Sequence, residues 1–266
     1  MIQQITIQSL EELLQLIGDQ SYDPAIERNR SYVLYRGVTD AEFPMKTSLQ
    51  RNCKHKQNVI EASILRNFSK YAASEAPLLN TSIWSQMALG QHHGLPTRLL
   101  DWTYSPLIAL HFSTSEDNLA DLDAHDAAIW QIDIRELNQL LPLSYQALLE
   151  KEKASLFTID MLDQLAQSTE TYDRDMGSRS MVLLEPPSID QRIINQYAYF
   201  SIIPMEIESI ETFLNEHTQN TIRYLLPKEL KWRIRDMLDQ MNVNERITHP
   251  GLDGLSAWLK RHYYVK

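Results

Sequence analysis

The amino-acid sequence predicts an α+β domain whose core is a mixed or antiparallel sheet flanked by helices. Residues 31–36 (SYVLYR) and 127–132 (AAIWQI) are rich in β-branched and aromatic side chains, which is typical of strands. Segments with apolar residues at helical spacing lie between such strands, but the two kinds do not alternate as regularly as in a doubly wound sheet. We therefore expect a single domain over residues 1–266.

The composition is that of an ordinary globular protein, with 43% hydrophobic and 23% charged residues in a chain of 266. Such a chain can bury a large core without cross-links, and the single cysteine, Cys53, excludes an internal disulfide. We interpret Cys53 as a surface thiol of a cytoplasmic protein. No apolar run approaches the ~20 residues of a membrane span, and the N-terminus lacks the features of a signal peptide, so we expect no membrane partner.

The net charge of −10 argues against nucleic-acid binding by the whole surface, because 35 Asp and Glu outnumber 25 Lys and Arg. Residues 46–56 are a local exception, since they contain Lys46, Arg51, Lys54 and Lys56. We interpret this stretch as a solvated loop, and a local basic site is the alternative.

Three elements are predicted in the first part of the chain. A capping box predicts a helix over 9–18, and apolar spacing predicts another over 58–74. Gly37 follows the strand at 31–36 and predicts a sharp turn, which would place Arg36 at the end of the strand. An arginine there can form a structural ion pair or bind a ligand, and the sequence leaves both roles open.

The stretch 84–115 contains two predicted helices. The first ends at Gly94, because glycine tolerates the backbone conformation that follows a helix C-terminus. Ser105 and Pro106 then have the chemistry of a helix start, with a serine cap and a proline in the first helical position. They predict a second, buried helix over 107–112.

Between these helices, the turn at 91–101 places histidines and charged residues among leucines. An unpaired buried ion costs far more free energy than the neighbouring leucines contribute. We therefore expect Arg98 and Asp101 to be partners, and we expect the turn to line the main cleft together with Arg36.

The remainder of the chain contains no repeat or low-complexity tract. Helical fragments joined by polar connectors predict a helical insertion or lid at about 135–180. Strands are predicted over 181–184, 197–203 and 221–226, and helical segments over 190–196, after Pro227 and over 251–263.

Adjacent histidines at 92 and 93 raise the question of a metal site. Neighbouring residues on a helix point ~100° apart, whereas zinc ligands on a helix are four residues apart, so we expect no metal. The sequence contains neither a nucleophilic serine elbow nor a glycine-rich phosphate loop. The polar residues that remain for a site are Arg36, Gln91, His92, Arg98, Asp101, Arg192 and Gln196.

Several motifs resemble those of one family. QHHGLPTRLLDW at 91–102, followed by SPLIALHFS at 105–113, resembles the central signature of the FRG domain, a bacterial and phage module named for a Phe-Arg-Gly triplet. The triplet reads Tyr35-Arg36-Gly37 in this chain. Later matches are Arg192, Ile193, Gln196 and Phe200, and then Leu252-Asp253-Gly254-Leu255. The matches span roughly residues 32–258, so the whole chain resembles one FRG domain.

The order of an aromatic-Arg-Gly triplet, a Ser-Thr-Ser run and a polar residue before a late strand is similar to that of ADP-ribosyltransferases of the Arg-Ser-Glu type. This resemblance implies that Arg36 holds the phosphates of NAD and that Ser113 shapes the nicotinamide pocket. The third position holds Gln196, an amide without the negative charge that stabilises a ribosyl cation. Glu185 is the alternative source of that charge.

The expected function is that of an NAD- or nucleotide-using ADP-ribosyltransferase or NAD glycohydrolase, an effector in bacterial defence or toxicity that acts on a protein or nucleic-acid acceptor. The alternative is a non-catalytic module that binds a nucleotide, another small molecule or a partner. The predicted catalytic residues are Arg36, His92, Gln196 and Glu185. The predicted cofactor-binding residues are Tyr35, Arg36, Gln91, His93, Arg98, Ser113 and Arg192.

Overall fold

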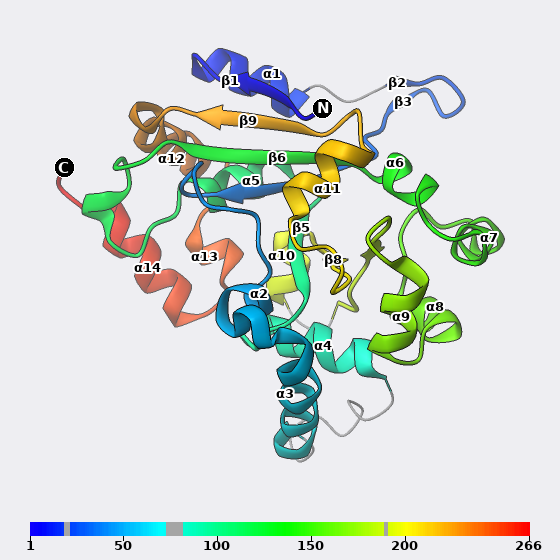
Figure 1. Cartoon of the computed structure of the whole chain (residues 1–266). Coiled ribbons are helices and arrows are strands. Elements are labelled where there is room, and N and C mark those ends of the chain that lie inside the picture. The colour runs from blue at the N-terminus through cyan, green and yellow to red at the C-terminus, as the bar shows by residue number, and fades with distance from the viewer. Residues whose placement is uncertain (19–21, 73–81, 189–190) are drawn as a thin grey trace.

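A computed structural model of the protein describes residues 1–18, 22–72, 82–188 and 191–266. Within these residues the chain has the predicted α+β fold, a mixed sheet with helices around it (Figure 1). The last residues of the helix predicted over 58–74 and the first of the segment predicted over 190–196 lie outside the described residues. None of the described helices combines the length and apolarity that crossing a membrane requires.

Seven strands of the described residues form the main sheet. They are β1 (Gln3–Thr6), β4 (Val33–Val38), β5 (Leu99–Thr103), β6 (Ala127–Asp133), β7 (Val182–Leu184), β8 (Ala198–Ile202) and β9 (Ile222–Leu226). Their order is β1-β9-β6-β4-β5-β8-β7. β1 is parallel to β9, and the other neighbouring pairs are antiparallel. A separate hairpin pairs β2 (Tyr22–Asp23) with β3 (Arg28–Asn29).

The helices cover both faces of this sheet and extend beyond its ends (Figure 1). They are α1 (Leu10–Gly18), α2 (Ser48–Cys53), α3 (Gln57–Ala72), α4 (Ile83–His92), α5 (Pro106–Ser113), α6 (Ile134–Gln139), α7 (Leu143–Glu152), α8 (Ile159–Leu165), α9 (Thr169–Met176), α10 (Gln191–Gln196), α11 (Ile210–His217), α12 (Lys231–Gln240), α13 (Glu245–Thr248) and α14 (Leu252–His262). A 3₁₀ turn over Lys54–Lys56 joins α2 to α3. Residues 46–56, which the sequence analysis interpreted as a loop, are therefore mostly helical.

The sharp turn predicted at Gly37 does not occur, because β4 continues through Gly37 to Val38. Glycine is needed here for packing instead. A Cβ at this position would lie 1.9 Å from the carbonyl oxygen of Ala109 and 2.7 Å from the amide nitrogen of Ser113, both in α5. The backbone of α5 thus lies directly against β4, and Arg36 is inside the strand rather than at its end.

The sheet is weakest between β4 and β5, where Tyr35 and Thr103 form the single bridge. By contrast, β4 pairs with β6 over six residues and β5 pairs with β8 over five. In Figure 1, β6 and β9 run across the view, whereas β5 runs down it. The two halves of the sheet therefore diverge beyond Tyr35, and Arg36 lies at the start of the gap between them.

The predicted turn at 91–101 is wrong at its end, because Leu99 begins strand β5. The segment at about 135–180, predicted as a helical insertion or lid, packs against this half of the sheet. Its helices α6 to α9 are confirmed. The apolar side chains of α7 to α9 share one core with α4, β5, β7 and β8, whereas those of α6 belong to a second core that contains Leu100 and Leu183. Trp84 Nε1, for example, donates to the carbonyl oxygen of Ala166 at 2.7 Å. The segment is part of the core and not a lid.

Candidate functional site

The gap between β4 and β5 brings Arg36 and Asp101 together. Arg36 Nη1 donates to the main-chain oxygen of Asp101 at 2.8 Å and lies 3.9 Å from its carboxylate Oδ2. The side chain of Arg36 is 18% exposed and that of Asp101 is 56% exposed. A mostly buried cation thus contacts a carboxylate that is open to solvent, and the prediction that Arg36 lies beside the 91–101 segment is confirmed.

Gln91 and Thr97 fix the orientation of this carboxylate. Gln91 Nε2 donates to both carboxylate oxygens of Asp101, at 3.1 and 2.9 Å. Gln91 Oε1 in turn accepts a hydrogen bond from Thr97 Oγ1 at 2.6 Å. Because a carboxylate only accepts, the amide nitrogen of Gln91 must face Asp101, which leaves the amide oxygen for the hydroxyl of Thr97. We refer to Arg36, Gln91, Thr97 and Asp101 as the gap site.

Arg36 retains hydrogen-bonding capacity. Its Nε is buried and has no hydrogen-bond partner among the described residues. Burial lowers the pKa of Arg36, the charge of Asp101 opposes that effect, and the nearby charge of Arg51 adds to it. An arginine nevertheless stays protonated at neutral pH. A buried guanidinium with one exposed carboxylate neighbour and an unused donor is suited to an anionic group such as phosphate.

The predicted pair of Arg98 and Asp101 is wrong. Arg98 is buried, and its guanidinium donates from Nε to Glu61 at 2.7 Å and from Nη1 to Asp173 at 2.5 Å. Residues three apart in an extended chain point to opposite sides, so Arg98 and Asp101 cannot face each other. Arg98 therefore holds α3 and α9 against β5, and it has no free surface for a cofactor.

His92 and His93 directly follow Gln91 at the C-terminal end of α4, and Arg192 of α10 approaches this end. Arg192 Nη1 is 3.5 Å from the main-chain oxygen of His92. The rings of His92 and His93 meet edge to face, with centroids 5.0 Å apart. Among the described residues, no three His, Cys, Asp or Glu side chains come together as a metal site would require. His93 is exposed and His92 is half-buried.

Three other predicted site residues have structural contacts. Ser113 is fully buried, and its hydroxyl donates to the carbonyl oxygen of Leu110 at 3.0 Å. Gln196 Nε2 donates to the carbonyl oxygen of Thr248 at 2.9 Å, which attaches α10 to α13. Tyr35 is buried in the core group that contains Ala109 and Leu110 of α5. The structure thus places these side chains in packing contacts and not beside Asp101.

Glu185 is exposed and follows β7. Its charge adds to the effect of burial in raising the pKa of Tyr199. Tyr199 precedes Phe200, the residue that pairs with Asp101, so Tyr199 and Asp101 point to opposite faces of the sheet. Of these two carboxylates, Asp101 contacts Arg36, whereas Glu185 acts on Tyr199.

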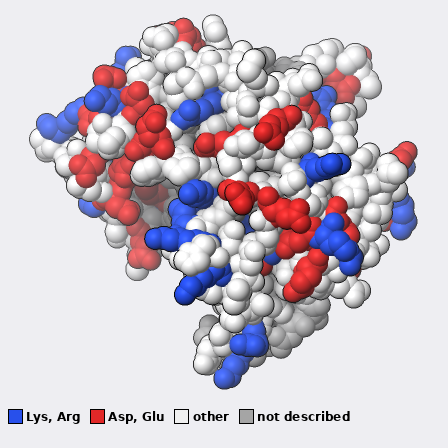
Figure 2. Space-filling view, viewed as in Figure 1, with Lys and Arg blue, Asp and Glu red and all other residues white. Residues whose placement is uncertain are grey.

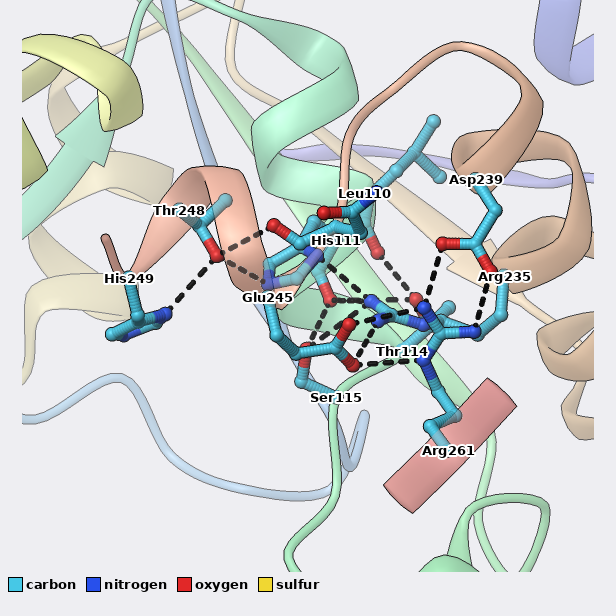
Figure 3. A network of polar contacts seen from close by, with 11 residues as sticks. Leu110, His111, Thr114, Ser115, Arg235, Asp239, Glu245, Thr248, His249 and Arg261 are labelled. Atoms are coloured by element: carbon cyan, nitrogen blue, oxygen red, sulfur yellow. Dashed lines mark hydrogen bonds and ion pairs between the residues drawn. The ribbon is translucent and has the colours of Figure 1, made fainter. Parts of the chain in front are cut away.

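A second polar cluster joins α5 to α12, α13 and α14 (Figure 3). We call it the His111 network, and it consists of His111, Arg235, Asp239, Glu245, Thr248, His249 and Arg261. Nδ1 of His111 lies 2.9 Å from Arg235 Nη1, and Nε2 lies 3.0 Å from Thr248 Oγ1. Because a guanidinium only donates, Nδ1 accepts and Nε2 carries the proton.

The charges of this network compensate one another. Arg261 contacts Asp239 at 2.7 Å and Glu245 at 2.8 Å, and Arg235 forms a further ion pair with Glu245. Burial lowers the pKa of His111 to about 3, with a contribution from the charge of Arg235. The network thus holds a neutral imidazole within paired ions, which fixes the C-terminal helices. Sequence reasoning missed Arg235 and Arg261, because an arginine in an amphipathic helix ordinarily marks the exposed face.

Two cavities lie away from the gap site. One of about 440 Å³ borders the His111 network and is lined in part by Phe112, His249 and Arg261. Another, of about 490 Å³, is lined in part by Asp40 and Arg223. Neither cavity is lined by Arg36 or by residues 91–101, so these two cavities do not support the prediction that those residues line the main cleft.

Comparison with known families gives one result that bears on this geometry. Residues 31–121 match the family model of the FRG domain. The match contains all four residues of the gap site, together with His92, Arg98 and His111. Comparisons with curated proteins and with solved structures return no match. The matched residues 31–121 include both sides of the gap in the sheet.

Proposed function

We propose that the gap site binds a nucleotide through its phosphates and that NAD is the substrate of an ADP-ribosyltransferase-like reaction. The observation that carries the proposal is the contact between Arg36 and Asp101 across the diverging strands. It combines a phosphate-binding cation with a carboxylate in an open position. The resemblance to Arg-Ser-Glu enzymes requires these two groups, and Gln196 does not supply the second.

In the proposed reaction the guanidinium of Arg36 holds a phosphate of NAD. The bond between ribose C1′ and the nicotinamide nitrogen breaks, and its electron pair leaves with nicotinamide. Asp101, which Gln91 holds in a fixed orientation, stabilises the cation that develops on the ribose. An acceptor nucleophile or water then bonds to C1′ and passes its proton to Asp101 and on to solvent.

The alternative is a module that binds the nucleotide without turnover. In that case Asp101 serves to orient Arg36, and its charge is not needed for any reaction. Both versions involve a phosphate at Arg36, and they differ only in the role of Asp101. An effector role in bacterial defence or toxicity is part of our proposal and is motivated by the resemblance to the FRG family alone.

Calorimetric titration with NAD, ATP and ADP-ribose tests the binding step. We expect Arg36→Ala to weaken NAD binding by at least about tenfold, whereas Arg174→Ala, at an exposed arginine of α9, should bind NAD as the wild type does. Failure of the wild type to bind NAD would overturn the proposed substrate.

Nicotinamide release tests the reaction. We expect Asp101→Asn to bind NAD as tightly as the wild type but to lose nicotinamide release, because an amide of the same shape cannot supply the charge. If the wild type binds NAD and releases no nicotinamide, with or without a cell lysate as the source of acceptor, the non-catalytic module is the correct interpretation.

A further inference from the structure

Residues 43–72, which form α2 and α3 and their connections, carry a charge opposite to that of the whole chain. The segment contains six basic residues, all of them exposed, and one acidic residue, Glu61, which is buried against Arg98. Its exposed residues therefore carry only positive formal charge, although the chain has a net charge of −10. The basic residues are Lys46, Arg51, Lys54, Lys56, Arg66 and Lys70.

These side chains lie on or beside consecutive elements, namely α2, the 3₁₀ turn at Lys54–Lys56 and α3. Figure 2 shows Lys and Arg in one group over α2 and in a second group along α3, with acidic side chains beside the first group. We call this surface, made of the six residues above, the α2–α3 basic surface. A patch of single sign in an acidic protein attracts a polyanion while the rest of the molecule repels it.

The α2–α3 basic surface adjoins the gap site through Thr97. The main-chain oxygen of Thr97 accepts from the amide of Leu49 in α2 at 2.9 Å, and its amide donates to Ser48 Oγ at 3.0 Å. The hydroxyl of Thr97 contacts Gln91, which holds Asp101. The charge of Arg51 also acts on the pKa of Arg36. A ligand lying along α2 would therefore pass beside the gap site.

Exposed apolar side chains accompany these charges. Phe43 is 59% exposed and Tyr71 is 72% exposed, at opposite ends of the segment. The ammonium group of Lys70 lies 5.2 Å from the centre of the Tyr71 ring. Basic residues combined with exposed aromatic rings suit single-stranded nucleic acid, because phosphates pair with the cations and unstacked bases lie on the rings. An acidic polypeptide would use the charges and leave the rings without a partner.

We propose that the α2–α3 basic surface binds single-stranded nucleic acid and positions it as the acceptor at the gap site. The second half of this inference rests on the proposed function, whereas the binding itself does not. The strand lies along α2 and α3 with its phosphates on the basic side chains, and the end near Thr97 presents a nucleotide to the gap site.

Binding is measured by fluorescence anisotropy with a labelled single-stranded DNA of mixed sequence at several salt concentrations. The variant Lys46→Glu/Lys54→Glu/Lys56→Glu reverses three charges of the surface. We expect it to bind at least about tenfold more weakly than the wild type. The magnitude of the slope of log K against log salt should also fall by about 2, because each of the three lost phosphate contacts contributes ~0.7.

The control variant is Lys151→Glu/Lys153→Glu/Arg174→Glu, on exposed residues of the α7 to α9 region. It changes the net charge equally, and Lys153 has a positive φ of 52°, which matches the 49° of Lys54. We expect the control to bind the strand with nearly wild-type affinity. Equal weakening of both variants, or wild-type affinity in the first, would overturn the proposed surface. Equally tight binding of polyglutamate would also overturn it in favour of an acidic protein partner.

The two proposals fail separately in this design. Arg36→Ala should lose NAD binding and keep the affinity for the strand, because Arg36 lies outside the α2–α3 basic surface. The triple variant of that surface should keep NAD binding and lose the strand. If the wild type binds DNA but not NAD, the proposed nucleic-acid surface is retained and the proposed substrate is wrong. If it binds NAD but not DNA, the proposed nucleic-acid acceptor is wrong.

Discussion

Arg36 in β4 donates a hydrogen bond of 2.8 Å to the main-chain oxygen of Asp101 in β5, across the gap where the two strands diverge. A regular antiparallel pair would satisfy this oxygen with an amide of the neighbouring strand. Here the guanidinium takes the place of that amide, so the same side chain closes the gap in the sheet and occupies the candidate site. Its removal therefore has a structural consequence as well as a functional one, and Asp101→Asn is the cleaner test of chemistry.

Unfolding in urea tests which carboxylate is the buried partner of Arg98. The sequence predicted Asp101, whereas the structure shows Glu61. Glu61→Ala leaves Arg98 buried beside Asp173 with one of its two partners removed, and we expect a loss of roughly 3–5 kcal/mol in the free energy of unfolding. Asp101→Ala removes an exposed carboxylate, and we expect a loss of less than about 1 kcal/mol. A larger loss for Asp101→Ala than for Glu61→Ala would contradict the assignment of the buried ion group.

Gly37→Ala tests the close contact between β4 and α5. The added Cβ would meet main-chain atoms of Ala109 and Ser113, which cannot rotate away as a side chain can. We expect a destabilisation of roughly 1–3 kcal/mol or more, measured by thermal or urea unfolding. Gly18→Ala is the control, because nothing lies within 4 Å of its added Cβ; it should be neutral or slightly stabilising. Similar losses in both variants would show that close packing is not the cause.

The elements that could be predicted from sequence are those with local signals. Ser105 and Pro106 predicted the start of α5, and Ser105 Oγ does accept from the amide of Ile108. Strand β5 was missed, because four of its five residues are buried and the alternation of a half-buried strand does not appear. Gly37 was misread for a related reason: a glycine that permits close packing and a glycine that permits a turn look alike in sequence.

The candidate site was predicted in part. The polar residues among the leucines of 91–101 correctly indicated that Arg36 and Asp101 lie together. The partner of Arg98 was predicted wrongly, because Glu61 and Asp173 lie 37 and 75 residues away in sequence. Local spacing carries no information on such contacts. The gap between β4 and β5 is likewise a property of tertiary structure and not of any single segment.

Gln196→Glu addresses the residue that sequence resemblance placed at the catalytic position. Gln196 Nε2 donates to the carbonyl oxygen of Thr248 at 2.9 Å, and a carboxylate at that place would face another oxygen. We expect weaker attachment of α13, seen as a lower melting temperature, and no gain in NAD hydrolysis. Gln191→Glu, at an exposed residue of the same helix, is the control for the charge change. An increase in nicotinamide release by Gln196→Glu alone would contradict the proposed role of Asp101 and indicate that residue 196 occupies the catalytic position.

The His111 network predicts how stability depends on pH. Burial and the charge of Arg235 lower the pKa of His111 to about 3, whereas the unfolded chain has an ordinary value of about 6.5. Between these values the unfolded chain binds a proton that the folded chain does not. The free energy of unfolding should therefore fall as the pH is lowered below about 6.5, by roughly 1 kcal/mol for each pH unit.

Glu245 adds to this effect at lower pH. Burial alone would raise its pKa, but the hydrogen bond from Arg261 and the charge of Arg235 lower it to about 2. Its contribution is complete above the ordinary value of about 4.5 and is lost as the pH falls toward 2. Urea unfolding at pH values from 7 to 4 measures the combined slope. We expect His111→Gln to be less stable at pH 7 and to show a shallower slope between pH 6.5 and 5, where Glu245 does not yet contribute. Parallel curves for the variant and the wild type would mean that folding does not lower the pKa of His111, which would contradict a neutral imidazole whose Nδ1 accepts from Arg235.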